Sequence, residues 1–265
     1  MGYREAVRWV YWVISTQLGF DIRRLVRSLR GVPAYCRDYR AFSRQYSGPM
    51  EWQPCLYDRY DEGGATRNEY FLQDLFVARW IHEENPVRHV DVGSRVDGFV
   101  AHVASFREIE VLDVRNITAK IPGVTFRQVD FTMTNPVAME TDGYCDSVSC
   151  LHAIEHFGLG RYGDSIDPQG YRRGIANLSG LLNKGGVLYL STPVGRQRVI
   201  FNANWIFDPL TLIEVGREYG LRADSFHVID GQEIVKVDLA DREKFHFLAS
   251  LDYRLGLFKF RKSPS

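Results

Sequence analysis

The sequence has few cysteines, no surplus of charge and no long apolar run, and each absence excludes a class of protein. Its 265 residues include four cysteines, none in C-x-x-C spacing, which is against a disulfide framework and favours free thiols in a reducing cytoplasm. Lysine plus arginine equals aspartate plus glutamate at 33 each, so no overall field draws the chain to nucleic acid, and we expect no nucleic-acid partner. No apolar run reaches the roughly 18 residues of a membrane span.

The positive charge is concentrated in residues 1–47. This segment holds nine arginines against three acids, a surplus of six. An apolar and aromatic run from Val7 to Ile14 is followed by an arginine-rich, helix-like stretch from Asp21 to Arg30. Because Arg8 interrupts the apolar run and no cleavage site of small residues follows, we expect a cytoplasmic protein without a secretory signal.

Two interpretations of this segment stay open. An amphipathic segment that carries Arg and Trp can lie peripherally in the headgroup region of an anionic membrane, here at its inner face. Its apolar stripe can equally pack on the main domain, or on a second subunit of a homodimer. In either case the composition predicts two domains, a basic, aromatic helical extension and loop over residues 1–66 and a larger domain over residues 67–265.

The segment Val87 to Phe99, VRHVDVGSRVDGF, is typical of a buried strand that ends in a ligand loop. Its β-branched residues predict a strand as far as Val92, and Gly93 permits a close approach between the backbone and a ligand. Residues 97–105 predict a helix whose N-terminus faces the same ligand.

The next two apolar runs also end in an acid. The run Ile109–Asp113 places a carboxylate twenty residues after Gly93, the separation at which a second parallel strand presents an acid to a ribose diol. The run Val124–Asp130 is followed by Phe131, so that an acid and an aromatic ring can bond and stack an adenine. Three neighbouring strand ends therefore predict a site for an adenosine-containing ligand.

At these residues, and at LLNKGGVLYLSTP (residues 181–193), the chain resembles the class I S-adenosylmethionine-dependent methyltransferases. The resemblance implies an α/β fold, a Rossmann-like, doubly wound sheet of about seven strands with the last antiparallel, preceded by an N-terminal helical extension. Residues 225–229 and 253–262 would be its last two strands, and Asn135-Pro136 a turn before the fourth. It also implies S-adenosylmethionine as the cofactor, bound by Asp91, Gly93, Ser94, Arg95, Asp97, Asp113, Val114, Asp130 and Phe131.

Two segments narrow the resemblance. HVDVGSRVDGF and SCLHAIEHFGLGRYGD look like a little-characterised bacterial branch associated with surface-polysaccharide biosynthesis. The first segment departs from the family's usual G-x-G-x-G loop, because Arg95 and Asp97 stand where the second and third glycines would be. Asp97 can contact the amino group of the cofactor and Arg95 its carboxylate. Alternatively, the two side chains pair with each other on the surface.

The segment with the most chemistry follows the fourth strand, Leu151 to Asp164, LHAIEHFGLGRYGD. Methyl transfer from a sulfonium is an in-line displacement, and the enzyme has to align the acceptor and remove the proton of an acceptor hydroxyl. His152 or His156 suits that proton transfer near neutral pH, with Glu155 orienting an imidazole. A histidine that contacts adenine, or one that only stabilises a turn, stays open as an alternative.

The spacing H-x-x-E-H also matches the inverted zinc peptidases, with His152 and His156 as ligands. Such a site needs a continuous helix, whereas Gly158, Gly160 and Gly163 interrupt one, so we predict no metal. A nicotinamide dehydrogenase is a further alternative, but the G-x-G-x-x-G pyrophosphate turn is missing.

The expected acceptor is a small molecule or a glycan. Polar residues after the fourth and fifth strands can bind a polyhydroxyl compound, namely Arg161, Tyr162, Asp164, Thr192 and Asn202. The sequence therefore favours O-methylation of a sugar or surface-glycan precursor. The alternatives are a non-catalytic methyltransferase-fold protein that binds a ligand or acts as a scaffold in polysaccharide biosynthesis, and a metal-dependent hydrolase that uses H-x-x-E-H.

Overall fold

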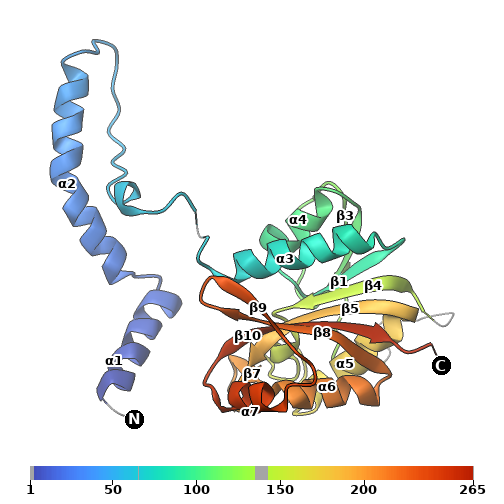
Figure 1. Ribbon diagram of the computed structural model, residues 1–265. Coiled ribbons are helices and arrows are strands. Elements are labelled where there is room, and N and C mark those ends of the chain that lie inside the picture. The colour runs from blue at the N-terminus through green and yellow to red at the C-terminus, as the bar shows by residue number, and fades with distance from the viewer. Residues whose placement is uncertain (1–2, 65, 135–142, 265) are drawn as a thin grey trace. The chain divides into compact units, whose positions relative to one another are not determined.

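The computed structural model describes residues 3–64, 66–134 and 143–264, and the chain divides into two compact units, Met1–Ala65 and Thr66–Ser265 (Figure 1). The turn expected at Asn135 and Pro136 lies outside the described residues.

The first unit consists of helices and a returning loop. It contains α1 (Tyr3–Trp12), the π-helical turn η1 (Val13–Gln17), α2 (Ile22–Ser43) and the 3-10 turn η2 (Asp58–Tyr60). Helix α2 begins where the Asp21 carboxylate accepts hydrogen bonds from the backbone N–H groups of Arg23 and Arg24 at 2.8 and 3.3 Å, donors that a helix start otherwise leaves unpaired. Among the described residues, no helix is both long and apolar enough to cross a bilayer.

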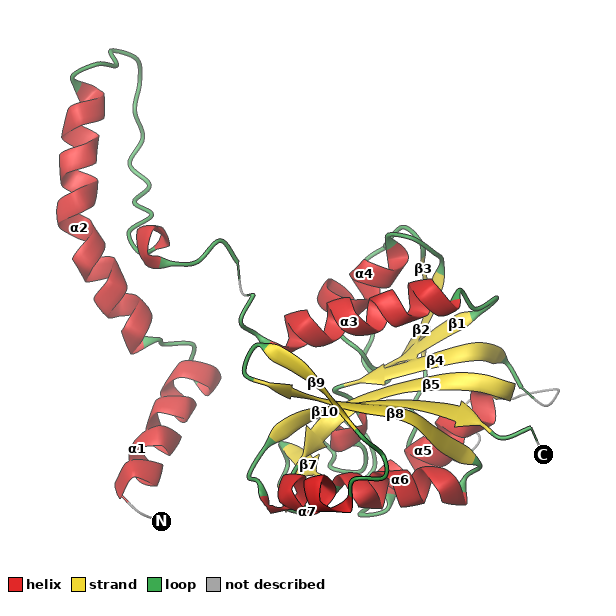
Figure 2. Ribbon diagram, viewed as in Figure 1, coloured by secondary structure: helices red, strands yellow, loops and turns green. Residues whose placement is uncertain are grey.

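The second unit is built on a mixed sheet (Figure 2). Its strands are β1 (His89–Val92), β2 (Ile109–Asp113), β3 (Val124–Gln128), β4 (Cys145–Leu151), β5 (Leu182–Val194), β6 (Arg198–Ile200), β7 (Asn204–Ile206), β8 (Leu221–Asp230), β9 (Glu233–Val237) and β10 (Arg254–Lys262). The large sheet has the order β3-β2-β1-β4-β5-β10-β8-β9, and β6 pairs with β7 separately. Strands β1 to β5 pair in parallel, whereas β10 lies antiparallel between β5 and β8, and β9 pairs antiparallel with β8.

Helices cover both faces of this sheet (Figure 1). On one face lie α3 (Glu69–Glu84), the π-helical turn η3 (Val96–Val100) and α4 (Ala101–Ala104), and on the other α5 (Gly170–Leu181), α6 (Pro209–Glu218) and α7 (Arg242–Ser250). In β5, Val187 and Tyr189 join the core beneath α3, while Leu188 and Leu190 join the core beneath α5 and α6, because successive strand residues point to opposite faces. Burial of both faces explains the nearly continuous apolar strands.

The predicted α/β fold is confirmed, including the antiparallel pairing of residues 225–229 with the last strand. The large sheet has eight strands rather than about seven, because the chain turns back at Gly231 (φ +64°) and adds β9 beside β8. The helix expected over residues 97–105 is instead the π-helical turn η3 followed by the single α-helical turn α4.

Candidate active site

A cavity of about 500 Å³ opens where β1, β2 and β4 end. Thirteen of the residues singled out from the sequence line it: Gly93, Ser94, Arg95, Asp97, Asp113, Val114, Asp130, Phe131, His152, His156, Arg161, Tyr162 and Asp164. Four others are outside its lining: Asp91, Glu155, Thr192 and Asn202. The parallel strands therefore gather most of the candidate residues at their carboxyl ends, where open α/β sheets bind ligands.

Asp91 holds the loop after β1 from below. Its carboxylate is fully buried and accepts hydrogen bonds from the backbone N–H of Ser94 at 3.0 Å, from the Ser94 hydroxyl at 2.6 Å and from the Ser149 hydroxyl at 2.5 Å. Burial raises the pKa of Asp91 to about 7, although these hydrogen bonds act in the opposite direction. Asp91 thus shapes the cavity floor through Ser94 rather than by facing the cavity.

Arg95 and Asp97 pair with each other at the cavity rim. The Arg95 Nη2 atom lies 2.7 Å from Asp97 Oδ2, and both side chains are largely exposed. The pair lowers the pKa of Asp97 through the hydrogen bond from Arg95. Of the two interpretations of this loop, the structure therefore shows the surface pair. An exposed pair of this kind contributes only about 0–1 kcal/mol, so a ligand can separate it at little cost.

Asp113, the expected ribose ligand, is held by Arg115, a residue that the sequence reasoning missed. The guanidinium donates to both carboxylate oxygens, at 2.9 Å from Nε and 2.5 Å from Nη2, and the Arg115 backbone N–H adds a third bond at 2.8 Å. Nη2 also reaches the Gly93 carbonyl at 3.2 Å, and the guanidinium lies 4.9 Å from the centre of the Tyr162 ring. Arg115 therefore occupies both oxygens of the carboxylate that the sequence assigned to a ribose diol.

Asp130 and Phe131 form the cavity wall after β3. The Asp130 carboxylate accepts hydrogen bonds from the Thr132 backbone N–H at 2.8 Å and from its hydroxyl at 2.7 Å. Phe131 is almost completely buried and packs in the core beneath α5. The part of the wall formed by Phe131 is therefore apolar and fixed by core packing.

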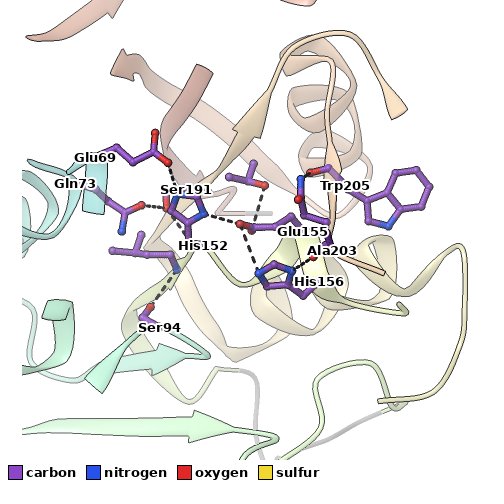
Figure 3. Close-up of polar contacts among 12 residues, drawn as sticks. Glu69, Gln73, Ser94, His152, Glu155, His156, Ser191, Ala203 and Trp205 are labelled. Atoms are coloured by element: carbon purple, nitrogen blue, oxygen red, sulfur yellow. Dashed lines mark hydrogen bonds and ion pairs between the residues drawn. The ribbon is translucent and has the colours of Figure 1, made fainter. Parts of the chain in front are cut away.

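The end of β4 carries a buried pair of His152 and Glu155 (Figure 3). His152 has φ +51°, and its Nδ1 lies 2.6 Å from Glu155 Oε1. Thr192 donates to the other carboxylate oxygen at 3.3 Å. Thr192 is completely buried, so it supports Glu155 instead of facing the acceptor as expected. Glu155 lies outside the cavity lining and contacts the His152 imidazole at Nδ1, the contact expected from the sequence.

The second ring nitrogen of His152 has no hydrogen bond. Nε2 is buried and unpartnered, 3.7 Å from Glu69 Oε1, and the Tyr70 ring stacks on the imidazole at 4.4 Å. Burial alone would lower the pKa of His152, but the carboxylates of Glu155 and Glu69 outweigh it, so that the pKa lies above its ordinary value. Glu69 in turn accepts a hydrogen bond from Tyr253.

His156 is held differently. Its Nδ1 lies 2.7 Å from the Ala203 carbonyl oxygen, which makes Nδ1 the donor, and its Nε2 is 4.0 Å from Glu155 Oε1. Burial lowers the pKa of His156, and the neighbouring Arg161 adds to that effect. His156 therefore ties the cavity wall to the β6–β7 hairpin.

In the loop after His156, the polar side chains form hydrogen bonds to backbone groups of the protein. Asp164 accepts hydrogen bonds from the backbone N–H groups of Gly158, Gly160 and Tyr162 at 2.8, 3.2 and 3.2 Å. Arg161 donates to the Ala203 carbonyl at 2.8 Å. Asn202, expected to bind the acceptor, is exposed and lies outside the cavity lining. Of these acceptor candidates, Arg161, Tyr162 and Asp164 line the cavity.

The geometry is against the zinc-peptidase alternative. Residues Ile154–His156 (η4) form a single 3-10 turn rather than a helix, and His152 and His156 approach Glu155 from two sides (Figure 3). Across the described ranges of the chain, no three His, Cys, Asp or Glu side chains are grouped so as to hold a metal ion.

The strand order, with β10 inserted antiparallel beside β5, defines a methyltransferase-like Rossmann fold. The [4+2]-cyclase SpnF has this fold, with a TM-score of 0.51 and 17% identity over 83% of this chain and 86% of that chain. The N-methyltransferase NodS from Bradyrhizobium japonicum WM9 has a TM-score of 0.51 and 16% identity over 76% and 98%. The 1,6-didemethyltoxoflavin-N1-methyltransferase from Burkholderia thailandensis, solved with S-adenosylhomocysteine, has a TM-score of 0.50 and 13% identity over 82% and 94%.

The chain belongs to the family described as Caenorhabditis protein of unknown function, DUF268, whose model matches residues 103–250. No curated protein matches the chain. The matched region runs from α4 to α7 and includes the His152–Glu155 pair. The narrower resemblance to a bacterial polysaccharide branch stays a prediction.

Proposed function

We propose that the protein is an S-adenosylmethionine-dependent methyltransferase that methylates an oxygen of a sugar or surface-glycan precursor. The observation that carries the proposal is the buried His152 at the end of β4, with Nδ1 bound to Glu155 and Nε2 left without a partner on the cavity wall. The structural neighbour solved with S-adenosylhomocysteine supports the cofactor class. SpnF, which shares the fold, is described as a cyclase, so the proposal depends on the site and not on the fold alone.

The cavity suits this cofactor in size and chemistry. Its volume of about 500 Å³ falls within the roughly 300–1,000 Å³ of small-ligand sites. Gly93 has φ +75° and no side chain, so its backbone can approach a ligand closely. Phe131 and Asp130 would contact the adenine, and Asp113 would bind the ribose hydroxyls once Arg115 releases it.

When bound, S-adenosylmethionine supplies an electrophilic methyl carbon. His152 would accept the proton of the acceptor hydroxyl at Nε2, the nitrogen without a hydrogen bond. Glu155 keeps the other proton on Nδ1 and thereby leaves Nε2 as the accepting atom. Because Nε2 is buried beneath Tyr70, the acceptor has to displace part of that cover, which also excludes water from the reaction.

The histidine supports oxygen as the methylated atom. A hydroxyl has to lose its proton to become a good nucleophile, so it needs a base, whereas a neutral amine already offers a lone pair. The sugar class is supported by the sequence resemblance and by the polar side chains at the cavity mouth, Arg161 and Tyr162.

Two measurements test the proposal separately. Calorimetry with S-adenosylmethionine and S-adenosylhomocysteine is expected to show binding of both, and no binding of either would contradict the cofactor class. Release of S-adenosylhomocysteine is then measured with a panel of nucleotide sugars and lipid-linked sugars. Binding without methylation of any sugar would overturn the acceptor class and leave the cofactor class standing.

A non-catalytic protein that binds a ligand or acts as a scaffold in polysaccharide biosynthesis is the second candidate. The bidentate contact of Arg115 with Asp113 favours it, because a permanently closed ribose site would bind no nucleoside. If the parent protein binds neither form of the cofactor and Arg115→Ala restores binding, the contact closes the site and this candidate replaces the first.

A further inference from the structure

Helix α2 has one face that the first unit covers itself. The residues after α2 return along it (Figure 1), and Gly31 fits so closely that an added Cβ would lie 1.9 Å from the Leu56 carbonyl oxygen. On the same side, the Arg24 guanidinium lies 4.1 Å from the centre of the Tyr57 ring. The returning segment therefore packs on the Gly31 face of α2.

The opposite face of α2 is apolar and uncovered by that segment. Ile22 lies nine residues before Gly31, two and a half turns of an α-helix, and therefore on the other side. From Ile22 the apolar residues recur at helical spacing, with exposed fractions of 44, 43, 46, 63 and 39% for Ile22, Leu25, Val26, Leu29 and Val32. Five exposed branched side chains on one face form a stripe, and a contiguous apolar stripe marks an interaction surface.

Further exposed apolar side chains precede α2 in the chain. Trp9 and Trp12 in α1 are 58 and 49% exposed, and Leu18 and Phe20 in the connection to α2 are 73 and 52% exposed. Trp residues favour the boundary between hydrocarbon and water, where the ring is buried and its N–H remains hydrated.

The charge of the segment selects among the partners. Residues 1–47 carry nine arginines against three acids, and within the described residues the side chains of Arg30, Arg40 and Arg44 make no ion pair. A surplus of unpaired cations beside an apolar stripe is complementary to a surface that is anionic and apolar beneath, as an acidic bilayer is.

We propose that the stripe of α2, together with Trp9, Trp12, Leu18 and Phe20, docks in the interface of an anionic phospholipid bilayer. The helices lie in the plane of the headgroups, because no helix among the described residues is long and apolar enough to span. Such docking would hold the cavity of the second unit on the same chain near lipid-linked acceptors. The docking itself does not depend on the proposed enzymatic activity.

Flotation of the full-length chain with vesicles tests this proposal. We expect the protein to float with phosphatidylcholine vesicles that contain phosphatidylglycerol, to remain unbound with phosphatidylcholine alone, and to be released in high salt, which screens the attraction. Tryptophan emission should shift to shorter wavelength in the bound fraction only.

Two sets of substitutions separate charge from apolar contact. Arg30→Gln, Arg40→Gln and Arg44→Gln together should lower the partition coefficient by about a hundredfold, since each cation near the membrane surface contributes about fivefold. Arg79→Gln, Arg196→Gln and Arg222→Gln remove the same charge from exposed positions of the second unit, 73, 70 and 75% exposed, and should leave binding within about threefold. Leu25→Ser with Leu29→Ser should abolish binding while circular dichroism stays unchanged.

Three outcomes would overturn the proposal. Equal flotation with and without phosphatidylglycerol would remove the role of the arginines. A change from dimer to monomer in light scattering on Leu25→Ser with Leu29→Ser, without vesicle binding by the parent protein, would identify the stripe as a contact between two copies. A lower melting temperature of the second unit in the same variant, again without vesicle binding, would identify it as a contact within the chain.

Discussion

The two ends of the cavity treat their charged groups differently. At the ends of β1 and β2, the carboxylates of Asp91 and Asp113 are satisfied from within the protein, by serines and by Arg115 respectively. At the end of β4, His152 Nε2 is buried without a hydrogen bond, with the Glu69 carboxylate 3.7 Å away. A buried polar atom without a hydrogen bond costs about 1–3 kcal/mol, which a ligand that hydrogen-bonds to Nε2 would recover.

The comparison teaches that position at a strand end does not by itself assign a role. Asp91 and Asp113 are both aspartates near a strand end, and Asp91 lies beside Val111, two residues before Asp113. Asp91 supports the loop, whereas Asp113 is paired with an arginine. His152 differs from both, because its Nε2 atom has no hydrogen bond. We call the Asp91 and Asp113 side of the cavity the satisfied end and the His152 side the unsatisfied end. Substitutions test whether the satisfied end controls cofactor binding and whether the unsatisfied end is catalytic.

The largest effect is expected at the unsatisfied end. His152→Gln should lower turnover by about 10²- to 10⁴-fold, because it removes the proton acceptor, while the affinity for S-adenosylhomocysteine stays unchanged. His246→Gln, at an exposed histidine on α7, is the matched control and should leave turnover unchanged. Equal turnover in both variants would contradict the role of His152 as the proton acceptor.

A smaller effect, in the opposite direction, is expected at the satisfied end. Arg115→Ala frees both oxygens of Asp113 and should tighten the binding of S-adenosylhomocysteine by about ten- to a hundredfold, the equivalent of a charge-assisted hydrogen bond of about 1.5–3 kcal/mol. Asp113→Asn should weaken binding in both backgrounds. Calorimetry measures each constant. Weaker binding in Arg115→Ala would mean that the guanidinium contacts the ligand directly.

The pH dependence should report His152 and not His156. Since the carboxylates of Glu155 and Glu69 raise the pKa of His152, kcat/KM should increase with pH with an inflection above the ordinary histidine value, as the base loses its proton. Glu155→Gln should move that inflection to lower pH. The stability contribution of the pair should be complete between the ordinary pKa of a glutamate and the ordinary pKa of a histidine. It should be lost as the pH rises through the raised pKa of His152 and as it falls through the lowered pKa of Glu155. An inflection that Glu155→Gln leaves in place would assign the titration to another group.

The smallest effect is expected at the rim. Arg95→Gln or Asp97→Asn breaks an exposed pair that contributes about 0–1 kcal/mol, so cofactor affinity should change by less than about fivefold. A loss of a hundredfold in either variant would restore the interpretation in which these side chains contact the cofactor. Melting temperature serves as the check that the loop remains folded.

The sequence predicted the elements whose signals are local. Apolar runs predicted the ends of the parallel strands β1 at Val92 and β2 at Asp113, and the end of β3 to within two residues of Asp130. The Gly-Gly turn before Val187 predicted the fifth strand. Strand β9 was not predicted. At the edge of the sheet three of its five residues are exposed, including Glu233 and Lys236, and this obscures the alternation of apolar and polar residues that marks a strand.

The details of the site depend on contacts that no local pattern encodes. Glu69 and Tyr70 lie more than eighty residues before His152 in the chain, and only the packing of α3 on the sheet brings them to it. The pairing of Arg115 with Asp113 spans two residues, and such a pair forms only if the loop after β2 bends back. The sequence contains D-V-R, but many strand ends do, and the triplet alone carries no prediction.

Strand β10 follows every other strand of the sheet along the chain, yet it lies between β5 and β8. Leu255, Leu257 and Phe258 are completely buried there. During synthesis β5 and β8 consequently lack the strand that joins them until β10 leaves the ribosome, and the unpaired strand edges are prone to aggregation until then. Removal of residues 254–262 should therefore produce an aggregating chain rather than a shortened, folded one.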